Sequence, residues 1–307
     1  MPRRHHPRTD HRRTAIAQEA IQRGHKVLGV YQRNKPTLEG LDGAVQRDLS
    51  DLASLQNWLM EAWPDAVINA AAVSAISDVD RDPDAAARVN IDMPALLAQV
   101  CHHMGIRFVH MSTDMVFCGE EAPYRSTSTP SPRSRYGEQK LEAERRILKA
   151  AAEESVVLRV ALLTGNTPGG RRSPHEALFA QWAAGKTTSL FTDEWRTPVS
   201  ISNTASAIMD LAERRDLSGI FHWGGTQRLS RHEMGERILA HFNLPSRLVQ
   251  AALRGDIPSC ASRPRDLSLE LAPLAGKLKT LPESFDDQVE TFIVPKPFRE
   301  WYLNLED

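Results

Sequence analysis

The sequence contains little cysteine and almost no net charge. Three of its 307 residues are cysteines, and none of them has the CxxC spacing typical of zinc and redox sites. An odd and widely spaced set of thiols favours a reducing compartment over a disulfide scaffold. The formal net charge of −1 argues against the broad basic field of a nucleic-acid-binding protein.

Long apolar runs are also absent, because none approaches the roughly 18 residues that a membrane-spanning helix needs. Hydrophobic residues make up 41% of the chain and charged residues 25%, proportions that argue against bulk disorder. The length corresponds to about two domains. We therefore expect a cytoplasmic globular protein with no metal site, no nucleic-acid partner and no membrane partner.

Glycine is missing from the first 14 residues, MPRRHHPRTDHRRT, which include five Arg and three His. The stretch has no apolar h-region and is therefore not a secretory signal. A solvated tail is the simplest interpretation of so many charges, and a nucleic-acid-binding arm is a second one.

Beyond these residues, short apolar runs alternate with amphipathic helix patterns. The patterns predict strands at 25–31, 44–50, 65–73, 105–114 and 156–163, and helices at 14–23, 51–63, 83–103 and 135–154. Strands alternating with helices at this spacing imply right-handed crossovers and a parallel sheet. The sequence therefore predicts an α/β fold with a Rossmann-like, doubly wound parallel sheet.

The alternation loosens after about residue 165, where the chain becomes rich in Gly, Pro and Arg. Helices predicted at 174–185, 203–215 and 230–242 there alternate with short strands. We divide the chain into an atypical basic segment at 1–13, a Rossmann-like domain at 14–165, and a smaller, partly interleaved mixed α/β substrate lobe at 166–307.

Ligands of such sheets bind beyond the carboxyl ends of the strands. Three segments follow predicted strands in this way, Asn69–Val73, Ser112–Asp114 and Leu162–Gly165. Small residues in the first would let a flat cofactor lie against the backbone, although they also suit tight strand–helix packing. Hydroxyls in the second could bind a substrate oxygen, although Ser and Thr are also common in turns.

Tyr136 and Lys140 share one face of a predicted helix, because they are four residues apart. An ammonium near a phenol favours the phenolate, which makes the phenol a useful acid or base for a carbonyl oxygen. The same spacing also occurs by chance on solvated helix faces, so the pair needs support from other motifs.

Five motifs supply that support, in the order INAAAV, RVNIDMPALLA, FVHMSTDMVFCGEEAPY, SPRSRYGEQKLEAE and VVLRVALLTG. Together they resemble the extended short-chain dehydrogenase/reductase family, in particular the branch of dTDP-4-dehydrorhamnose reductase and the regulatory β subunit of methionine adenosyltransferase. The segments FTDEWRTPVSISNTASAI, GIFHWGGTQRLSRHEMGERI and SRPRDLSLE resemble the second half of that branch. The likeness covers residues 14 to about 275.

The resemblance implies catalytic and substrate-binding roles. Tyr136 would donate the proton, and Lys140 would hold the nicotinamide ribose and tune Tyr136. Thr113 would polarise the substrate carbonyl, with Asp114 at the sugar and Arg263 near a substrate diphosphate.

The resemblance also implies an NADP or NAD cofactor bound by residues 14–165. Asn69, Ala70, Ala71 and Ala72 would lie along it, and Asp48 and Leu49 would border its adenine. Arg33 would meet a 2′-phosphate and so favour NADP, although an exposed loop cation is an equal alternative.

Two departures from the family pattern stand out. The family's STDYVF is STDMVF here, so Met115 replaces an aromatic residue. More seriously, the family's first strand and GxxGxxG turn are replaced by residues 1–13, although that turn brings backbone N–H groups to the pyrophosphate. A replacement of matching length and Arg/His/Pro composition suggests a shifted reading frame or a misassigned start, which resequencing the gene would test.

Two functions remain from these patterns. One is NAD(P)H-dependent reduction of a nucleotide-linked 4-keto sugar, which the retained Thr113, Tyr136 and Lys140 favour. The other is a non-catalytic nucleotide-binding or regulatory protein, which the missing glycine turn favours. A nucleic-acid-binding module rests on the first 14 residues alone. Helices at 84–103 and 135–150 leave open whether the protein forms a homodimer.

Overall fold

The computed structural model describes residues 11–32, 35–36, 38–167 and 169–304. They form two compact units. The first unit consists of the described part of Met1–Ser112 with Glu138–Leu158 and Ala205–Ile220. The second consists of Thr113–Gly137, Arg159–Thr204 and the described part of Phe221–Asp307. Most of the basic segment that we singled out, residues 1–10, lies outside the described residues.

The first unit begins with helix α1 (His11–Gln22), three residues earlier than predicted. Strands β1 (Leu28–Tyr31) and β2 (Gly43–Gln46) then pair in parallel. Helix α2 (Leu52–Ala62) follows, and its N-terminus is capped by Asp51, whose carboxylate accepts a hydrogen bond from the Ser54 backbone N–H at 3.1 Å.

A second, four-stranded sheet has the order β10–β5–β4–β3. Its strands are β3 (Ala66–Asn69), β4 (Arg107–Thr113), β5 (Ser155–Val160) and β10 (Gly219–Trp223). β3 and β4 run parallel, with Asn69 opposite His110. Every residue of β4 and β5 is buried, as expected for parallel strands with helices on both faces.

The two sheets do not join within the described residues, because no strand there pairs with the second edge of β1 or of β3. In a doubly wound sheet of this family the first strand occupies the place between these two. The described residues therefore form a Rossmann-like sheet in two pieces. The gap between the pieces fits the absence of a glycine-rich turn from the sequence of residues 1–13.

The predicted helix at 83–103 is wrong in one respect, because it is not continuous. It consists of α4 (Pro83–Ala87), a π-helical turn (Arg88–Asp92) and α5 (Met93–Met104), with α3 (Ile76–Arg81) preceding it. A π-helical turn accommodates one extra residue and often occurs at a functional position. It contains Asn90, which is 1% exposed.

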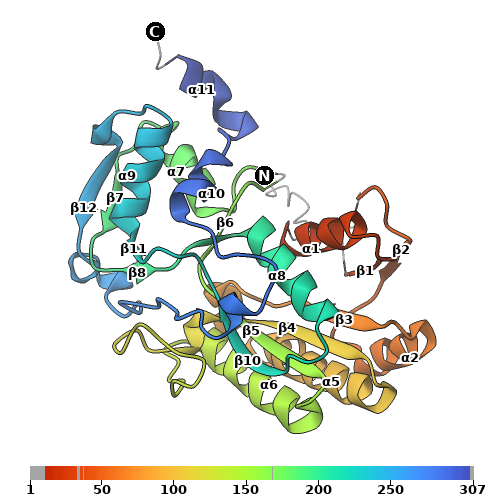
Figure 1. Ribbon diagram of the computed structural model, residues 1–307. Coiled ribbons are helices and arrows are strands. Elements are labelled where there is room, and N and C mark those ends of the chain that lie inside the picture. Colours follow the sequence, from red (N-terminus) through yellow and green to blue (C-terminus); the bar gives the residue numbers. More distant parts are fainter. Residues whose placement is uncertain (1–10, 33–34, 37, 168, 305–307) are drawn as a thin grey trace. The chain divides into compact units, whose positions relative to one another are not determined.

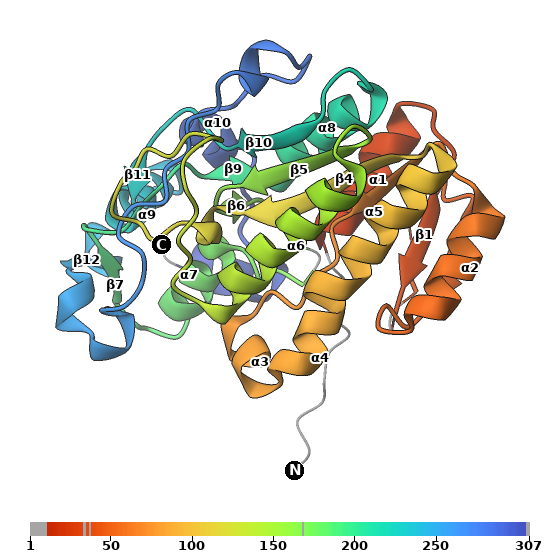
Figure 2. The ribbon, with the colours of Figure 1, turned by 90° about the horizontal axis from the view of Figure 1, so that it is seen from below.

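Helix α6 (Arg135–Ala151) lies beside α5 along one face of β4 and β5, and α1 and α8 (Ile201–Glu213) lie on the other face (Figures 1 and 2). Arg23, which follows α1, binds α8 through Asp210 at 2.7 Å and Glu213 at 3.2 Å. The apolar core of the first unit gathers the buried side chains of Leu49, Leu55, Leu59, Met93, Leu97, Phe108, Ile147 and Val157.

The second unit is a mixture of helices and short strand pairs. It contains β6 (Leu163–Thr164) with β9 (Val199–Ser200), β7 (Thr188–Phe191) with β12 (Val249–Ala252), and β8 (Trp195–Arg196) with β11 (Leu229–Ser230). Its helices include α7 (Pro174–Trp182), α9 (Arg231–His241), α10 (Phe285–Glu290) and α11 (Arg299–Leu303). Their apolar faces share one core around Phe179, Trp182, Leu239 and Phe285.

The observed strands are shorter than the predicted ones. The run at 65–73 forms a strand only over Ala66–Asn69, and the following small residues form an irregular loop up to α3. The run at 25–31 likewise narrows to Leu28–Tyr31. Among the described residues, no helix combines the length and the apolar character required to cross a bilayer.

Candidate active site

The carboxyl end of β3 carries the predicted cofactor-binding segment Asn69–Ala72. Asn69 is 4% exposed, and its Oδ1 accepts a hydrogen bond from the Ala71 backbone N–H at 3.0 Å. The amide therefore turns the chain sharply out of the strand. The Ala side chains that follow keep this loop narrow, which suits the close approach of a flat ligand.

Asn90 fixes the other end of this loop. Its Oδ1 accepts from the Val73 backbone N–H at 2.8 Å, and its Nδ2 donates to the Val73 carbonyl at 3.0 Å and to Gln139 Oε1 at 2.9 Å. The sequence reasoning missed Asn90. The available signal was a polar residue at an inward-facing position of an apolar helix.

Lys140 is buried within the first unit and is held by two contacts to β4. Its Nζ donates to the Met111 carbonyl at 2.6 Å and contacts His110 Nε2 at 2.7 Å. Tyr136, 7% exposed, lies one turn earlier on the same helix α6. The structure thus places Lys140 against β4, beside His110, which the sequence reasoning missed.

Ser112 and Glu144 form a second buried contact between β4 and α6. The Ser112 hydroxyl donates a short hydrogen bond to Glu144 Oε1, and Glu144 is 1% exposed. This bond commits the Ser112 hydroxyl to a structural partner. Of the two adjacent hydroxyls, Thr113 is therefore the better candidate for a substrate oxygen, as the resemblance implies.

Thr113 and Asp114 belong to the second unit and interact with each other. Thr113 Oγ1 donates to Asp114 Oδ1 at 3.1 Å and accepts from the Met115 backbone N–H at 3.2 Å. Burial raises the pKa of Asp114, although Arg196, the Thr113 hydroxyl and Arg231 oppose the rise. To donate to a substrate, the Thr113 hydroxyl would exchange Asp114 for the new acceptor.

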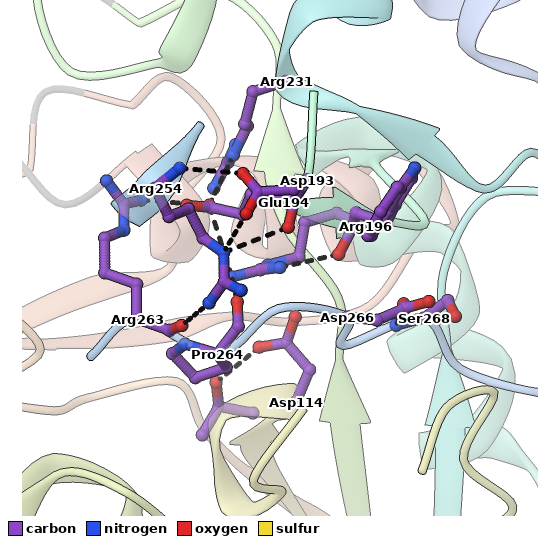
Figure 3. A network of polar contacts seen from close by, with 12 residues as sticks. Asp114, Asp193, Glu194, Arg196, Arg231, Arg254, Arg263, Pro264, Asp266 and Ser268 are labelled. Atoms are coloured by element: carbon purple, nitrogen blue, oxygen red, sulfur yellow. Dashed lines mark hydrogen bonds and ion pairs between the residues drawn. The ribbon is translucent and has the colours of Figure 1, made fainter. Parts of the chain in front are cut away.

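A cluster of cations surrounds Glu194 in the same unit (Figure 3). Glu194 is fully buried, and its Oε1 lies 2.8 Å from Arg231 Nε, 3.0 Å from Arg263 Nη2 and 3.3 Å from Arg196 Nη2. Burial favours the neutral acid, but Arg231, Arg196 and Arg263 outweigh it and lower the pKa of Glu194.

Arg263 was predicted to meet a diphosphate, and the structure pairs it with Glu194 and stacks it on Phe191 at 5.6 Å. A further cavity of about 120 Å³ in this unit is lined by Trp195, Arg228, Arg265, Asp266 and part of the 119–122 loop. Arg228 and Arg265 lie over the Trp195 ring at 4.5 and 5.2 Å. The cavity therefore combines an aromatic ring with two arginines and the carboxylates of Glu120 and Asp266.

Asp48 and Leu49, which were predicted to border the adenine of the cofactor, differ in their exposure to solvent. Asp48 is exposed, and hydrogen bonds from the Ser50 backbone and hydroxyl, with a smaller one from Gln32, lower its pKa. The Leu49 side chain packs into the core, so its backbone alone could border a ligand. Arg33 lies outside the described residues.

A doubly wound sheet with small residues after β3, a hydroxyl ending β4 and a Tyr-x-x-x-Lys helix is typical of the short-chain dehydrogenase/reductase fold. Residues 13–296 match the family model described as the RmlD substrate binding domain. The chain belongs to this family, a branch of the extended short-chain dehydrogenases/reductases.

Two relatives illustrate its range. The probable low-salt glycan biosynthesis reductase Agl14 of Haloferax volcanii is 30% identical over 283 residues, covering 90% of this chain and 92% of the relative. Methionine adenosyltransferase 2 subunit beta of Bos taurus is 27% identical over 298 residues, covering 93% and 86%.

Solved structures agree on the fold. The hypothetical dTDP-4-dehydrorhamnose reductase of Sulfolobus tokodaii has a TM-score of 0.75 at 27% identity, covering 89% of this chain and 93% of its own. The dTDP-4-dehydrorhamnose reductase of Bacillus anthracis, solved with NADP, has a TM-score of 0.76 at 19% identity, covering 87% and 98%.

Proposed function

We propose that the protein is an NAD(P)H-dependent reductase of a nucleotide-linked 4-keto sugar. The observation that carries the proposal is the retained set of Tyr136 and Lys140 on α6 with Thr113 at the end of β4, in a chain that belongs to a reductase family. The Haloferax relative, named as a reductase, supports the same class of reaction.

The proposed reaction adds one hydride and one proton to the keto group. A reduced nicotinamide, when bound, would supply the hydride for the keto carbon. Tyr136 gives its phenolic proton to the carbonyl oxygen, so that an alcohol forms, and Thr113 donates a hydrogen bond to the same oxygen as charge develops. Lys140 holds the cofactor ribose and stabilises the resulting phenolate until it is reprotonated.

The cofactor assignment rests on the segments after β2 and β3. Asn69, Ala70, Ala71 and Ala72 would lie along the nicotinamide half, and Asp48, Leu49 and Arg33 near the adenosine. The Bacillus structure contains NADP and the structure of the Bordetella bronchiseptica enzyme WbmG contains NAD, which supports a nicotinamide cofactor of either kind, and Arg33 would slightly favour NADP. The substrate's nucleotide would be met in the second unit by Arg263 and its cationic neighbours, with the sugar near Asp114.

A regulatory, non-catalytic role is the second candidate. One observation favours it: the described sheet lacks a strand between β1 and β3, and the glycine turn that would follow that strand is missing from residues 1–13. The bovine relative is named as a subunit of another enzyme, which fits the same idea. We propose a cytoplasmic location for either role.

One experiment separates the two roles. NADPH is titrated calorimetrically into this chain and into a variant whose residues 1–10 are replaced by an apolar strand and a GxxGxxG turn. Each is then assayed with a dTDP-linked 4-keto-6-deoxy sugar. NADPH oxidation by either protein supports the reductase. Cofactor binding by the variant without any turnover supports the regulatory role.

A further inference from the structure

Gly137 lies in the first turn of α6, immediately after Tyr136, where a glycine needs an explanation. Glycine is one of the least favourable residues in a helix, because it gains no side-chain contacts and loses the most backbone freedom. The backbone of Gly137 is helical, and its N–H donates to Ser134 Oγ at 3.2 Å. The position therefore does not require a backbone conformation reserved for glycine, and something else excludes a side chain.

The segment that follows β4 excludes it. A Cβ atom on Gly137 would overlap the Met115 carbonyl oxygen and would lie 2.9 Å from Pro132 Cβ and 3.2 Å from the Met115 carbonyl carbon. The backbone of α6 therefore lies directly against the backbone of the 3₁₀ turn Asp114–Val116, with no side chain between them. Because Met115 makes this contact through its carbonyl group, the contact does not depend on the methionine side chain that departs from the family pattern.

This backbone contact joins two residues of the proposed reaction. Tyr136 precedes Gly137 on the helix, and Thr113 Oγ1 accepts a hydrogen bond from the Met115 backbone N–H at 3.2 Å. All four residues belong to the second unit. Thr113 is 9% exposed and Tyr136 is 7% exposed, so close neighbours limit how far either side chain can adjust. The spacing of the two hydroxyls therefore follows the spacing of the two backbones.

We propose that Gly137 is a positioning residue that sets the distance between the Tyr136 phenol and the Thr113 hydroxyl. The inference rests on the proposed reductase function, in which both hydroxyls must reach one carbonyl oxygen. A methyl group at residue 137 would push the Met115 carbonyl and α6 apart by about 1 Å, and a misplacement of that size can lower a rate by about 10²-fold. The loss should appear in kcat rather than in cofactor affinity, because the crowded atoms hold the hydroxyls.

A role in packing alone would give a different result. Crowding Gly137 would then lower the free energy of unfolding and leave the turnover of the folded protein unchanged. Gly225 provides a matched control, because a Cβ atom there would overlap the Pro198 carbonyl oxygen and lie 3.1 Å from the Glu283 carbonyl oxygen. It belongs to the same unit, and its crowding involves neither of the two hydroxyls.

Gly137→Ala and Gly225→Ala test the proposal in the full chain, with a dTDP-linked 4-keto-6-deoxy sugar at saturating NADPH. We expect Gly137→Ala to lower kcat by about 10²-fold and to keep the NADPH Kd, measured calorimetrically, within about twofold of the parent. Gly225→Ala should lose stability in urea titrations but keep its kcat. A folded Gly137→Ala with kcat within about twofold of the parent, or an equal loss of kcat in Gly225→Ala, would overturn the proposal.

Ser134→Ala replaces Gly137→Ala if the latter does not fold. It removes the hydroxyl that accepts from the Gly137 N–H, and so loosens the first turn of α6 without adding an atom. The kcat should then fall by about tenfold with NADPH affinity unchanged, and an unchanged kcat would refute the positioning role.

Crystal structures separate this inference from the proposed function. If the parent chain does not reduce the sugar, the reductase function fails. A shift of Met115 away from α6 by about 1 Å in Gly137→Ala would then still support the role of Gly137 in spacing the two backbones. Backbones of Met115 and residue 137 that superimpose in the parent and the variant would refute that role.

Discussion

Strands β4 and β5 differ from β1 and β3 in burial, although all four belong to the same doubly wound arrangement. Every residue of β4 and β5 is buried, whereas β1 is at most half-buried and its Leu28 is 48% exposed. Three of the four residues of β3 are also only partly buried. The less buried strands are those that would flank the family's first strand, so the difference marks the place where the described residues contain no strand.

This difference in burial also separates the catalytic groups of the proposed function from its cofactor-binding surface. In the proposed function, the well-packed strand β4 supplies Thr113 and the Met111 carbonyl that holds Lys140, whereas the loosely packed strands would border the pyrophosphate of the cofactor. If the proposed function holds, the described residues retain the groups for catalysis, whereas part of the surface that would hold the cofactor is not found among them. The predictions below test these two halves separately, from the largest expected effect to the smallest.

The largest effect should come from the well-packed half. Tyr136→Phe removes the proton source and should lower kcat for NADPH oxidation by about 10²–10⁴-fold, with the fold unchanged by circular dichroism. Tyr302→Phe, which removes a hydroxyl bonded to the Phe242 carbonyl, is the matched control and should keep full activity. Activity of Tyr136→Phe within about twofold of the parent would contradict its role.

Introducing the family's first strand and glycine turn should strengthen cofactor binding next to the loosely packed strands. An apolar strand and GxxGxxG turn in place of residues 1–10 would return two charge-assisted hydrogen bonds to the pyrophosphate. Each is worth about 1.5–3 kcal/mol, so NADPH affinity should rise on the order of 10²-fold or more. Micromolar NADPH binding by the unaltered chain, insensitive to salt, would show that residues 1–13 serve the site after all.

A matched pair of valines compares the two halves in stability. Val157 on β5 is fully buried, and Val30 on β1 packs only partly against the same core. Val157→Ala should lower the free energy of unfolding by about 2 kcal/mol, and Val30→Ala by less than about 1 kcal/mol, in urea titrations. Equal losses would mean that β1 is as tightly packed as β5.

The effect that appears only on acidification concerns His110, at the contact between β3 and β4. Its pKa lies well below the ordinary 6.5 in the folded protein, so below pH 6.5 the unfolded chain binds a proton that the folded chain does not. Stability should therefore fall on acidification, by about 1.4 kcal/mol per pH unit until the folded pKa is reached. His110→Gln should reduce this slope relative to the parent protein, and an unchanged slope would mean that His110 does not stay neutral.

Much of the fold followed from local signals. Asp51 caps α2, and Gly105 ends α5 in a left-handed conformation. The apolar runs between such helix start and stop signals form the strands. The Tyr136 and Lys140 pair was equally visible, because helical spacing alone brings them to one face. These features depend on residues close in sequence.

The features that were missed depend on residues far apart in sequence. The π-helical turn forms around Asn90, whose partners Val73 and Gln139 come from distant segments. The His110 contact with Lys140 likewise needs β4 packed against α6. Glu194 was not singled out in the sequence, because its ion pairs join it to Arg231 and Arg263 from distant segments as well as to the nearby Arg196.

The π-helical turn at Arg88–Asp92 gives this region an unusual sensitivity to deletion. Removing one residue from it would restore regular α-helical hydrogen bonding and join α4 to α5. The segment before the deletion would then rotate by about 100° and shift by about 1.5 Å relative to α5. The helix would become more regular, yet Asn90 would lose its hydrogen bonds to the Val73 backbone. At this point the chain length, together with the Asn90 amide, keeps the loop after β3 in place.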